Sequence, residues 1–187
     1  AAVTSSHFCA AERQFRFPLE YGGQRPPTAQ WTVTGSGAAV LAAQGGGPFV
    51  ESVTIGKMVD LGVKDANNMG AAMAPAAAQT IKDFLTDTAT APADYDLILT
   101  GDLGQVGSDL LYELLQKDNI DISGVHNDCG LLIFDRESQD VHAGGSGCGC
   151  AGSVLCSHIF NQLRAGQLKN ILFCATGALM STTSSQQ

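Results

Sequence analysis

Asp96-Leu97-Ile98-Leu99-Thr100-Gly101-Asp102 is a short apolar run that ends in a glycine and an aspartate. An apolar run of this length, followed by residues that favour turns, predicts a buried β-strand over 96–100. Downstream, Ser108 is predicted to cap a helix, because a serine hydroxyl can accept a backbone N–H at a helix start. Leucines at 110, 111, 114 and 115 would form the buried face of that helix. The stretch is therefore predicted to be one β–α unit.

The same alternation of strand and helix continues on both sides of this unit. Upstream, Pro75 is predicted at the start of a helix, where proline is tolerated, with apolar residues at 77, 81, 84 and 85 on one face. Downstream, a third helix is predicted to follow the glycine-rich stretch His142–Gly149 and to end at Gly166. Further strands are predicted at Ala1–Ser6, Gly35–Leu41, Val50–Gly56, Gly130–Phe134 and Ile171–Ala175. Strands that alternate with helices predict an α/β fold with helices packed on a sheet.

The composition fits a folded domain and excludes several classes of function. The 187 residues are 44% apolar and 15% charged, with a net charge of −8. This length corresponds to one domain or a piece of a larger protein, and the apolar content argues against disorder. The acidic balance, without any run of lysine and arginine, argues against binding to nucleic acid. No stretch approaches the roughly 20 apolar residues of a membrane helix, and the N-terminus lacks the pattern of a secretion signal.

Six cysteines lie among apolar or small residues, at positions 9, 129, 148, 150, 156 and 174. This setting favours free thiols in a reduced, intracellular compartment. The pair in Cys148-Gly149-Cys150 is too closely spaced for a zinc knuckle, and no second pair completes it. No metal site is therefore predicted.

The stretch His142–Cys150, which leads into a helix, is the first of four candidate sites. Glycines let the backbone approach a ligand closely, and a helix start offers N–H donors to an anion. A thiol in such a position, as Cys148 would be, can have a lowered pKa. The alternative is that the glycines only allow a helix to pack tightly on a strand. The spacing matches neither the dinucleotide GxGxxG pattern nor a phosphate-binding P-loop, which excludes nucleotide binding through those motifs.

The other candidates are a polar tetrapeptide, a loop and a turn. His126-Asn127-Asp128-Cys129, predicted to precede a strand, offers a base, hydrogen-bonding groups and a thiol; the alternative is a turn in which Asn127 and Asp128 bond their own backbone. In the loop over 7–23, Arg13 and Arg16 alternate with aromatic residues and can clamp a planar anion. The alternative there is an internal Glu12–Arg16 pair with aromatic packing. Thr176-Gly177-Ala178 can offer backbone N–H groups as half of an oxyanion hole.

Several motifs occur along the whole chain in an order that resembles one family. They are Thr4-Ser5-Ser6-His7, Ala11-Glu12-Arg13-Gln14-Phe15-Arg16, Glu20-Tyr21-Gly22-Gly23-Gln24, Asn68-Met69-Gly70-Ala71-Ala72-Met73-Ala74-Pro75-Ala76-Ala77-Ala78, Leu99-Thr100-Gly101-Asp102-Leu103, His126-Asn127-Asp128-Cys129-Gly130, Ala143-Gly144-Gly145-Ser146-Gly147-Cys148 and Ala175-Thr176-Gly177-Ala178-Leu179. On these motifs the chain resembles the stage V sporulation protein AD (SpoVAD) family, within the thiolase-like superfamily.

The resemblance implies a thiolase-like fold, an α/β sandwich with two pseudo-symmetric halves. The chain would carry the end of the first half with its long loop, residues 1–48, and most of the second half, residues 49–187. The acyl-accepting cysteine of thiolase-like enzymes would precede Ala1, and a closing strand would follow Gln187. The chain is thus expected to be a fragment or to be completed by another polypeptide. An incomplete half leaves apolar surface uncovered, which favours a homodimer or a missing segment.

The resemblance also implies that no catalytic residue remains. Ser146 stands where thiolases place a catalytic histidine, and a serine cannot act as a base near neutral pH as imidazole does. The stretch Cys174-Ala175-Thr176-Gly177-Ala178 keeps a thiol but not the glycines that follow it in thiolases. Two alternatives stay open: acyl transfer or condensation by a cysteine thiolate with His126 or His142 as base, and a scaffold for membrane partners.

The function that the resemblance implies is the binding of dipicolinic acid, alone or with calcium, for uptake into the developing spore together with other SpoVA membrane proteins. A flat dicarboxylate needs cations or N–H donors at its ends and an apolar face for its ring. The predicted ligand-binding residues are Arg13, Arg16, Tyr21, His126, Asn127, Ser146, Cys148 and Thr176. No other cofactor is expected. The protein would be cytoplasmic and associate peripherally with the forespore or spore inner membrane.

Overall fold

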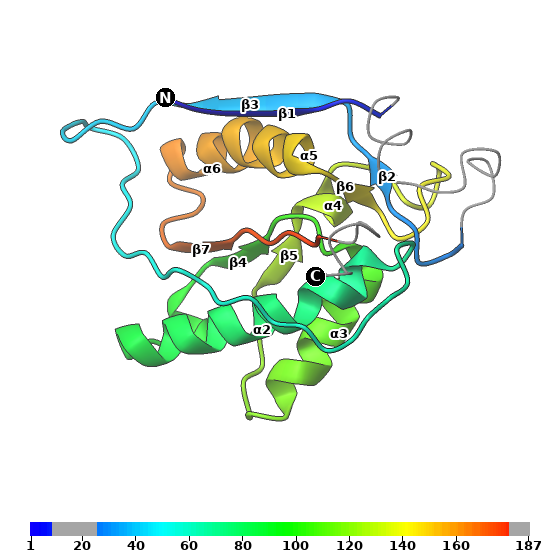
Figure 1. Ribbon diagram of the computed structural model, residues 1–187. Helices are drawn as coiled ribbons and strands as arrows, with labels where there is room; N and C mark the ends of the chain where they lie inside the picture. Colours follow the sequence, from blue (N-terminus) through cyan, green and yellow to red (C-terminus); the bar gives the residue numbers. More distant parts are fainter. Residues whose placement is uncertain (9–25, 180–187) are drawn as a thin grey trace.

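A computed structural model describes residues 1–8 and 26–179, which form layers of strands and helices (Figure 1). The strands are β1 (Ala2–Ser6), β2 (Trp31–Thr32), β3 (Gly35–Ala39), β4 (Leu97–Thr100), β5 (His126–Asp128), β6 (Gly145–Ser146) and β7 (Ile171–Cys174). The helices are α2 (Met69–Thr88), the 3₁₀ turn η2 (Pro92–Asp94), α3 (Gly104–Gln116), α4 (Cys129–Leu132), α5 (Cys148–Ser153), the π-helical turn η3 (Val154–Ile159) and α6 (Phe160–Arg164). The predicted α/β class is confirmed.

The central layer is a parallel sheet with the strand order β5-β4-β7. Its middle strand, β4, is the predicted apolar run, and Ile98 and Leu99 are completely buried. Because side chains alternate across a strand, these two residues face opposite layers. Ile98 packs with residues of α2 and α3, whereas Leu99 packs with residues of α5 and η3. The strand is therefore apolar on both faces because helices cover both faces.

Helices α2 and α3 form the layer below the sheet in Figure 1. The predicted buried face of α2 is confirmed, with Ile81, Phe84 and Leu85 in the core. The predicted start at Pro75 is wrong: the helix begins at Met69, and the Asn68 side chain accepts the Ala71 N–H as a cap. The alanine-rich residues before Pro75 favour helix strongly enough to extend it by more than a turn on that side.

The start of α3 also differs from the prediction. The helix begins at Gly104, and Ser108 lies inside it, buried, instead of capping it. The structure satisfies the first N–H groups differently, because the buried carboxylate of Asp128 accepts the N–H groups of Leu103 and Gly104. A side chain from a distant strand thus takes the role that a local serine was predicted to fill.

On the other side of the sheet, α5, η3 and α6 follow one another directly, and an antiparallel ribbon of β1 and β3 lies over them (Figure 1). The predicted helix after His142–Gly149 is confirmed, including its end next to Gly166. A short parallel pairing of β2 with β6 lies beside the start of α5. The predicted strand at 1–6 is confirmed, whereas the one at 35–41 ends at Ala39, and Val40 and Leu41 are exposed.

Two predicted strands are wrong. Residues 50–56 form no strand, and Val50, Val53 and Ile55 are exposed. Alternating residues form a strand only where a neighbouring strand supplies hydrogen bonds, and none of the described segments pairs with this one. In the second case, the apolar residues after Cys129 form the short helix α4, and the strand is the polar triplet before it. Short apolar runs of this kind do not distinguish a strand from a helix.

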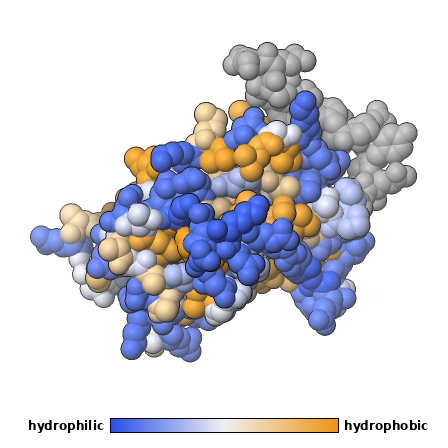
Figure 2. All heavy atoms as spheres, turned by 90° about the horizontal axis from the view of Figure 1, so that it is seen from below, coloured by the Kyte–Doolittle hydropathy of each residue, from blue (hydrophilic) through white to orange (hydrophobic). Residues whose placement is uncertain are grey.

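On the side of α2 and α3, the surface is mostly hydrophilic, with smaller apolar areas between the polar groups (Figure 2). Within the described residues, no helix has the length and apolar character needed to cross a membrane.

The backbone of the β1 and β3 ribbon comes close to that of α5, with only the small side chains of Thr4, Ser6 and Ser153 between them. A Cβ added to Gly37 would lie 2.5 Å from the carbonyl carbon and 2.8 Å from the Cα of Gly152. A Cβ added to Gly149 would lie 2.7 Å from the backbone nitrogen of Ser6. All three distances are shorter than real Cβ contacts. The alternative interpretation of the glycine-rich stretch, tight packing of a helix on a strand, therefore holds for Gly149, and Gly152 farther along α5 packs in the same way.

We predict that Gly37→Ala lowers the stability of the fold by about 1–3 kcal/mol, because the new methyl group overlaps the backbone of α5. The control is Gly124→Ala, where an added Cβ meets nothing within 4 Å, and its effect should stay within about 0.5 kcal/mol. Urea unfolding of both variants measures the difference. Equal midpoints for the two variants would contradict the close contact.

Candidate functional site at the carboxyl edge of the sheet

Asp128, the last residue of β5, is completely buried and accepts four hydrogen bonds. One carboxylate oxygen accepts the Thr100 hydroxyl at 2.6 Å and the Leu103 N–H at 2.9 Å. The other accepts the N–H groups of Gly104 at 3.0 Å and Gly130 at 2.9 Å. Burial raises the pKa of this carboxyl, and the four donors act against that rise. Because two donors face each carboxylate oxygen, the hydrogen bonds stabilise the ionised form against the effect of burial.

A directed chain of hydrogen bonds runs from Asp128 to the surface of α3. The Thr100 proton goes to Asp128, so the Thr100 oxygen accepts from Nε2–H of His126 at 3.0 Å. Nδ1 of His126 then accepts the Tyr112 hydroxyl proton at 2.8 Å, and the two rings meet edge to face. Burial lowers the pKa of His126 to about 4. The imidazole is therefore neutral near pH 7, with one tautomer fixed by its partners.

Asp102, two residues beyond the end of β4, joins the sheet to the start of α5. Its carboxylate accepts the Gly147 N–H at 2.8 Å. Its carbonyl oxygen accepts from the Gln30 amide at 2.8 Å, and the same amide also donates to the Gly145 carbonyl at 2.7 Å. Burial, and to a lesser extent the charge of Asp128, raises the pKa of Asp102 to about 6. A half-buried carboxyl group, Asp102, and a completely buried one, Asp128, thus lie at the same edge of the sheet.

The start of α5 contains two of the predicted ligand-binding residues. Ser146 is buried at the end of β6, and Cys148 is exposed at the first position of α5. The Cys148 thiol donates to the Ser5 carbonyl at 3.1 Å. The Gly149 N–H donates to the Ser6 hydroxyl, which itself donates to the Val33 carbonyl. These contacts tie the helix start to β1.

The buried cysteines are protonated thiols near neutral pH. Burial raises the pKa values of Cys129 and Cys150, and nearby negative charges raise them further. Burial raises the pKa of Cys174 to about 11. Neither nitrogen of His126 bonds to a sulfur, since both are taken by hydroxyl groups. These three thiols therefore lack the thiolate character that nucleophilic catalysis requires.

The remaining predicted residues are divided between the two faces of the sheet. His126 and Thr176 lie on the side of α2 and α3, where the Thr176 hydroxyl donates to the Met73 sulfur at 3.6 Å. Ser146 and Cys148 lie at the start of α5, which packs on the opposite side. Asn127 is half-buried, and its side-chain oxygen accepts the Asp128 N–H. The structure brings Ser146 and Cys148 together but does not place all five of these residues around one point.

Arg13, Arg16 and Tyr21 lie outside the described residues. The predicted clamp in the loop over 7–23 therefore stays a prediction.

Several residues of the edge were missed by the sequence analysis, above all Thr100, Asp102 and Asp128 as a connected group. The signal that could have found them is an aspartate at or just beyond the carboxyl end of a parallel strand, as Asp128 is in β5 and Asp102 is two residues after β4. Arg136 was missed as well: its guanidinium donates to the Gln105 side chain at 2.5 Å and to the His142 carbonyl at 3.3 Å. It adds a cation to the loop before the start of α5.

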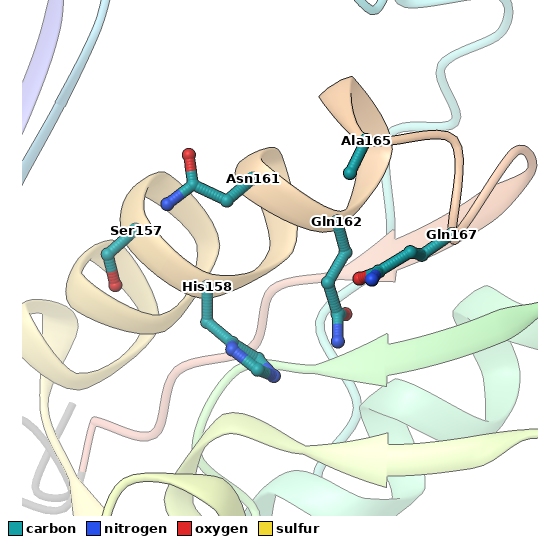
Figure 3. Close-up of a pocket in the computed structure, with 6 residues that line it drawn as sticks. All are labelled: Ser157, His158, Asn161, Gln162, Ala165 and Gln167. Carbon is teal, nitrogen blue, oxygen red and sulfur yellow. The ribbon is translucent and has the colours of Figure 1, made fainter.

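A separate pocket with a volume of about 490 Å³ lies along η3 and α6, which continue from the end of α5. It is lined by Ser157, His158, Asn161, Gln162, Ala165 and Gln167, which Figure 3 shows along η3, α6 and the following turn. None of these belongs to the predicted ligand-binding residues. Over residues 1–8 and 26–179, no three side chains of His, Cys, Asp or Glu converge to hold a metal ion.

Comparison with known proteins shows the family of the whole chain. The family model described as stage V sporulation protein AD (SpoVAD) matches residues 1–187. A protein of Bacillus subtilis (strain 168), named stage V sporulation protein AD, is 54% identical over 186 residues. The chain belongs to the SpoVAD family. It spans about half of the length of that relative, since the match covers 100% of this chain and 55% of the relative. The SpoVAD proteins are proteins of sporulation, and the resemblance inferred from the motifs is confirmed.

In this SpoVAD chain, we predict that Thr100→Val lowers the stability of the fold by about 1–3 kcal/mol. The valine removes one of the four donors to the buried Asp128 carboxylate and the acceptor of His126 Nε2–H, so two hydrogen bonds are lost without replacement. Thr100→Ser keeps the hydroxyl and is the matched control, with the larger part of the stability retained. Urea unfolding curves of the three proteins make the comparison. A serine variant as unstable as the valine variant would contradict the role of the hydroxyl.

We also predict that Asp102→Asn stabilises this SpoVAD chain above pH 6. The pKa of Asp102 is higher in the folded state than the ordinary 3.8, so folding takes up a proton between about pH 4 and 6, and stability falls as the pH rises through that window. Asparagine removes this penalty, which is on the order of 1–3 kcal/mol at pH 7.5. Thermal melts from pH 4 to 7.5 should show a gain that disappears toward pH 4. A gain that is independent of pH would contradict the buried charge.

Proposed function

We propose that this SpoVAD chain is part of a dipicolinic acid-binding protein of the developing spore, and that it binds its ligand without catalysing a reaction. The family supports the setting in sporulation. The observation that favours binding over acyl transfer is the state of the cysteines and His126. The pKa values of three buried thiols are raised, and His126 is engaged by Thr100 and Tyr112 on both ring nitrogens.

The ligand site of this proposal lies around the start of α5. Ser146 lies there in a buried position, and Arg136 supplies a guanidinium in the preceding loop. Arg13, Arg16 and Tyr21 are proposed to supply further cationic and aromatic contacts, and Asn127 and Cys148 the polar ones. Thr176 lies on the side of α2 and is not proposed to contact a ligand at this place. His126 is proposed to act indirectly, because it is neutral and both of its nitrogens are occupied.

The wider setting is part of the same proposal. The α/β layers are compatible with a thiolase-like fold, with residues 1–48 ending a first half and 49–187 forming most of a second. Exposed apolar residues at 49, 50, 53, 55 and 58 support contact with further protein, either a second copy or more of the same polypeptide. The protein is proposed to accompany other SpoVA proteins at the forespore or spore inner membrane, and calcium is proposed to arrive with the ligand.

Isothermal titration calorimetry of the full-length protein with dipicolinate tests the binding. We predict that Arg13→Ala and Ser146→Leu each weaken the affinity about tenfold or more, through loss of a charged contact and loss of space respectively. The matched control for the first is Arg164→Ala, an exposed arginine at the end of α6, which should bind as the wild type does. Circular dichroism confirms that each variant is folded.

Two results would overturn this proposal. One is a wild-type protein that does not bind dipicolinate, with or without calcium. The other is a stable thioester on a cysteine after incubation with an acyl-CoA, detected by mass spectrometry, which would favour acyl transfer instead.

A further inference from the structure

The segment 49–58 lies on the surface of α2 (Figure 1). A Cβ added to Gly56 would lie 2.6 Å from the hydroxyl oxygen of Thr80. Next to it, Nζ of Lys57 lies 3.2 Å from a carboxylate oxygen of Asp83. Among the described residues, no strand pairs with this segment. Helix α2 therefore supports the segment from one side.

The opposite side of the segment is apolar and exposed. Thr54 is half-buried, whereas its neighbours Val53 and Ile55 are 77% and 91% exposed. Because side chains alternate along an extended chain, Thr54 faces α2 and its two neighbours face away from it. Met58 is 99% exposed as well. Several exposed apolar side chains on one short segment indicate a contact with another macromolecule.

The charges near these residues favour a protein partner over a membrane. Between residues 26 and 59, the only charged side chains are Glu51 and Lys57, although the whole chain has a net charge of −8. An anionic membrane surface attracts clusters of lysine and arginine, and this stretch has a single lysine. The stretch is also neutral as a whole, so two copies of the acidic chain meet here without added repulsion.

The segment is complementary to itself when two copies run antiparallel with Thr54 at the centre. Residues equally far from Thr54 on either side then oppose each other. Val53 of one copy meets Ile55 of the other, and Glu51 meets Lys57. Lys57 is 73% exposed, so its ammonium group keeps donors for a second carboxylate beside that of Asp83. The pattern favours a second copy as the partner, because one segment supplies both members of every pair.

We propose that two copies of this chain associate through the segment 49–58, which runs antiparallel to itself across a two-fold axis. Val53 and Ile55 form the apolar centre of the contact, and a Glu51–Lys57 pair between the copies lies at each end. The proposal identifies a second copy as the partner of these exposed apolar residues. It does not depend on the ligand, so the oligomeric state and the affinity for dipicolinate are tested separately.

The first test is sedimentation equilibrium of the full-length protein, for the wild type, Glu51→Lys and Lys57→Glu. We expect the wild type to be a dimer at micromolar concentrations. Each substitution places like charges opposite each other at both ends of the contact, so the dissociation constant of the dimer should rise about tenfold or more. The matched controls, Glu113→Lys and Lys117→Glu, make the same charge changes on exposed residues of α3 and its C-cap. Both controls should dimerise as the wild type does.

A mixture of the two variants tests the antiparallel alignment. In a mixed dimer, two positive side chains of one copy face two negative side chains of the other. The mixture should therefore recover the wild-type dissociation constant to within about threefold. Lys57→Glu also loses the ion pair with Asp83, whereas Glu51→Lys keeps it, so the same effect in both variants excludes that loss as the cause. A mixture that associates no more tightly than the separate variants would overturn the proposal.

The apolar centre is tested by Ile55→Asp, with Ile55→Val as the matched control. The aspartate removes an apolar contact at two symmetric positions, and the dissociation constant should rise about a hundredfold or more. The valine keeps an apolar side chain and should retain the dimer. Circular dichroism shows that both variants are folded.

Three further results would each overturn the proposal. A wild-type full-length protein that stays monomeric at all concentrations means that more of the same polypeptide, and not a second copy, covers the segment. A dimer that Ile55→Asp leaves intact means that the copies meet elsewhere. A monomer that binds phospholipid vesicles, and loses this binding in Ile55→Asp, identifies a membrane as the partner of the segment.

Discussion

The carboxylate of Asp128 is the interaction on which the edge of this sheet depends. It fixes the start of α3 through the N–H groups of Leu103 and Gly104, and the start of α4 through that of Gly130. It also orients the Thr100 hydroxyl, which in turn determines the tautomer of His126. A buried charge is stable only when donors surround it, and here the donors come from β4 and the segments that follow β4 and β5. The geometry of all three segments is therefore coupled to one side chain.

This arrangement also explains why the edge is a poor place for thiolate chemistry. The charges of Asp102 and Asp128 act on Cys129 and Cys150, and negative charge close to a thiol disfavours a second negative charge. A nucleophilic cysteine needs the reverse, a nearby cation or a base. The same acidity means that an anionic ligand requires compensation, either from arginines or from protonation of a carboxyl group. Thiolate chemistry and the binding of an anionic ligand are thus both disfavoured by the negative charge of these two aspartates unless that charge is compensated.

The sequence predicted those parts of the fold that depend on local pattern. The strand at 96–100, the buried face of α2 and the helix after His142–Gly149 all have enough apolar residues at regular spacing to define them. The boundaries at Pro75 and Ser108 were wrong because caps from Asn68 and Asp128 determine them, and Asp128 acts across 24 and 25 residues of sequence. The segment 50–56 has the pattern of a strand but no described partner, a property that the pattern itself does not contain.

Of the site, the sequence identified the start of α5 but not the carboxyl groups behind it. Ser146 and Cys148 could be identified from the sequence because glycines before a helix are a local signal. Asp102 lies 45 residues away from Gly147, and their hydrogen bond exists only once β4 and α5 are packed together. His126 was identified as a base from its residue type alone. Its two partners, Thr100 and Tyr112, show that it is a neutral link in a chain of hydroxyl groups.

The contact between Gly37 and Gly152 has a mechanical consequence. Where side chains separate two elements, changes of rotamer can absorb small displacements. Two backbones in direct contact cannot adjust in this way. The ribbon of β1 and β3 and the first turns of α5 must therefore shift as a rigid unit. The hydroxyl of Ser6, at the end of β1, also accepts the Gly149 N–H. Any rearrangement at the start of α5 is thus transmitted to the outermost layer of the molecule, about one helix diameter away from the sheet.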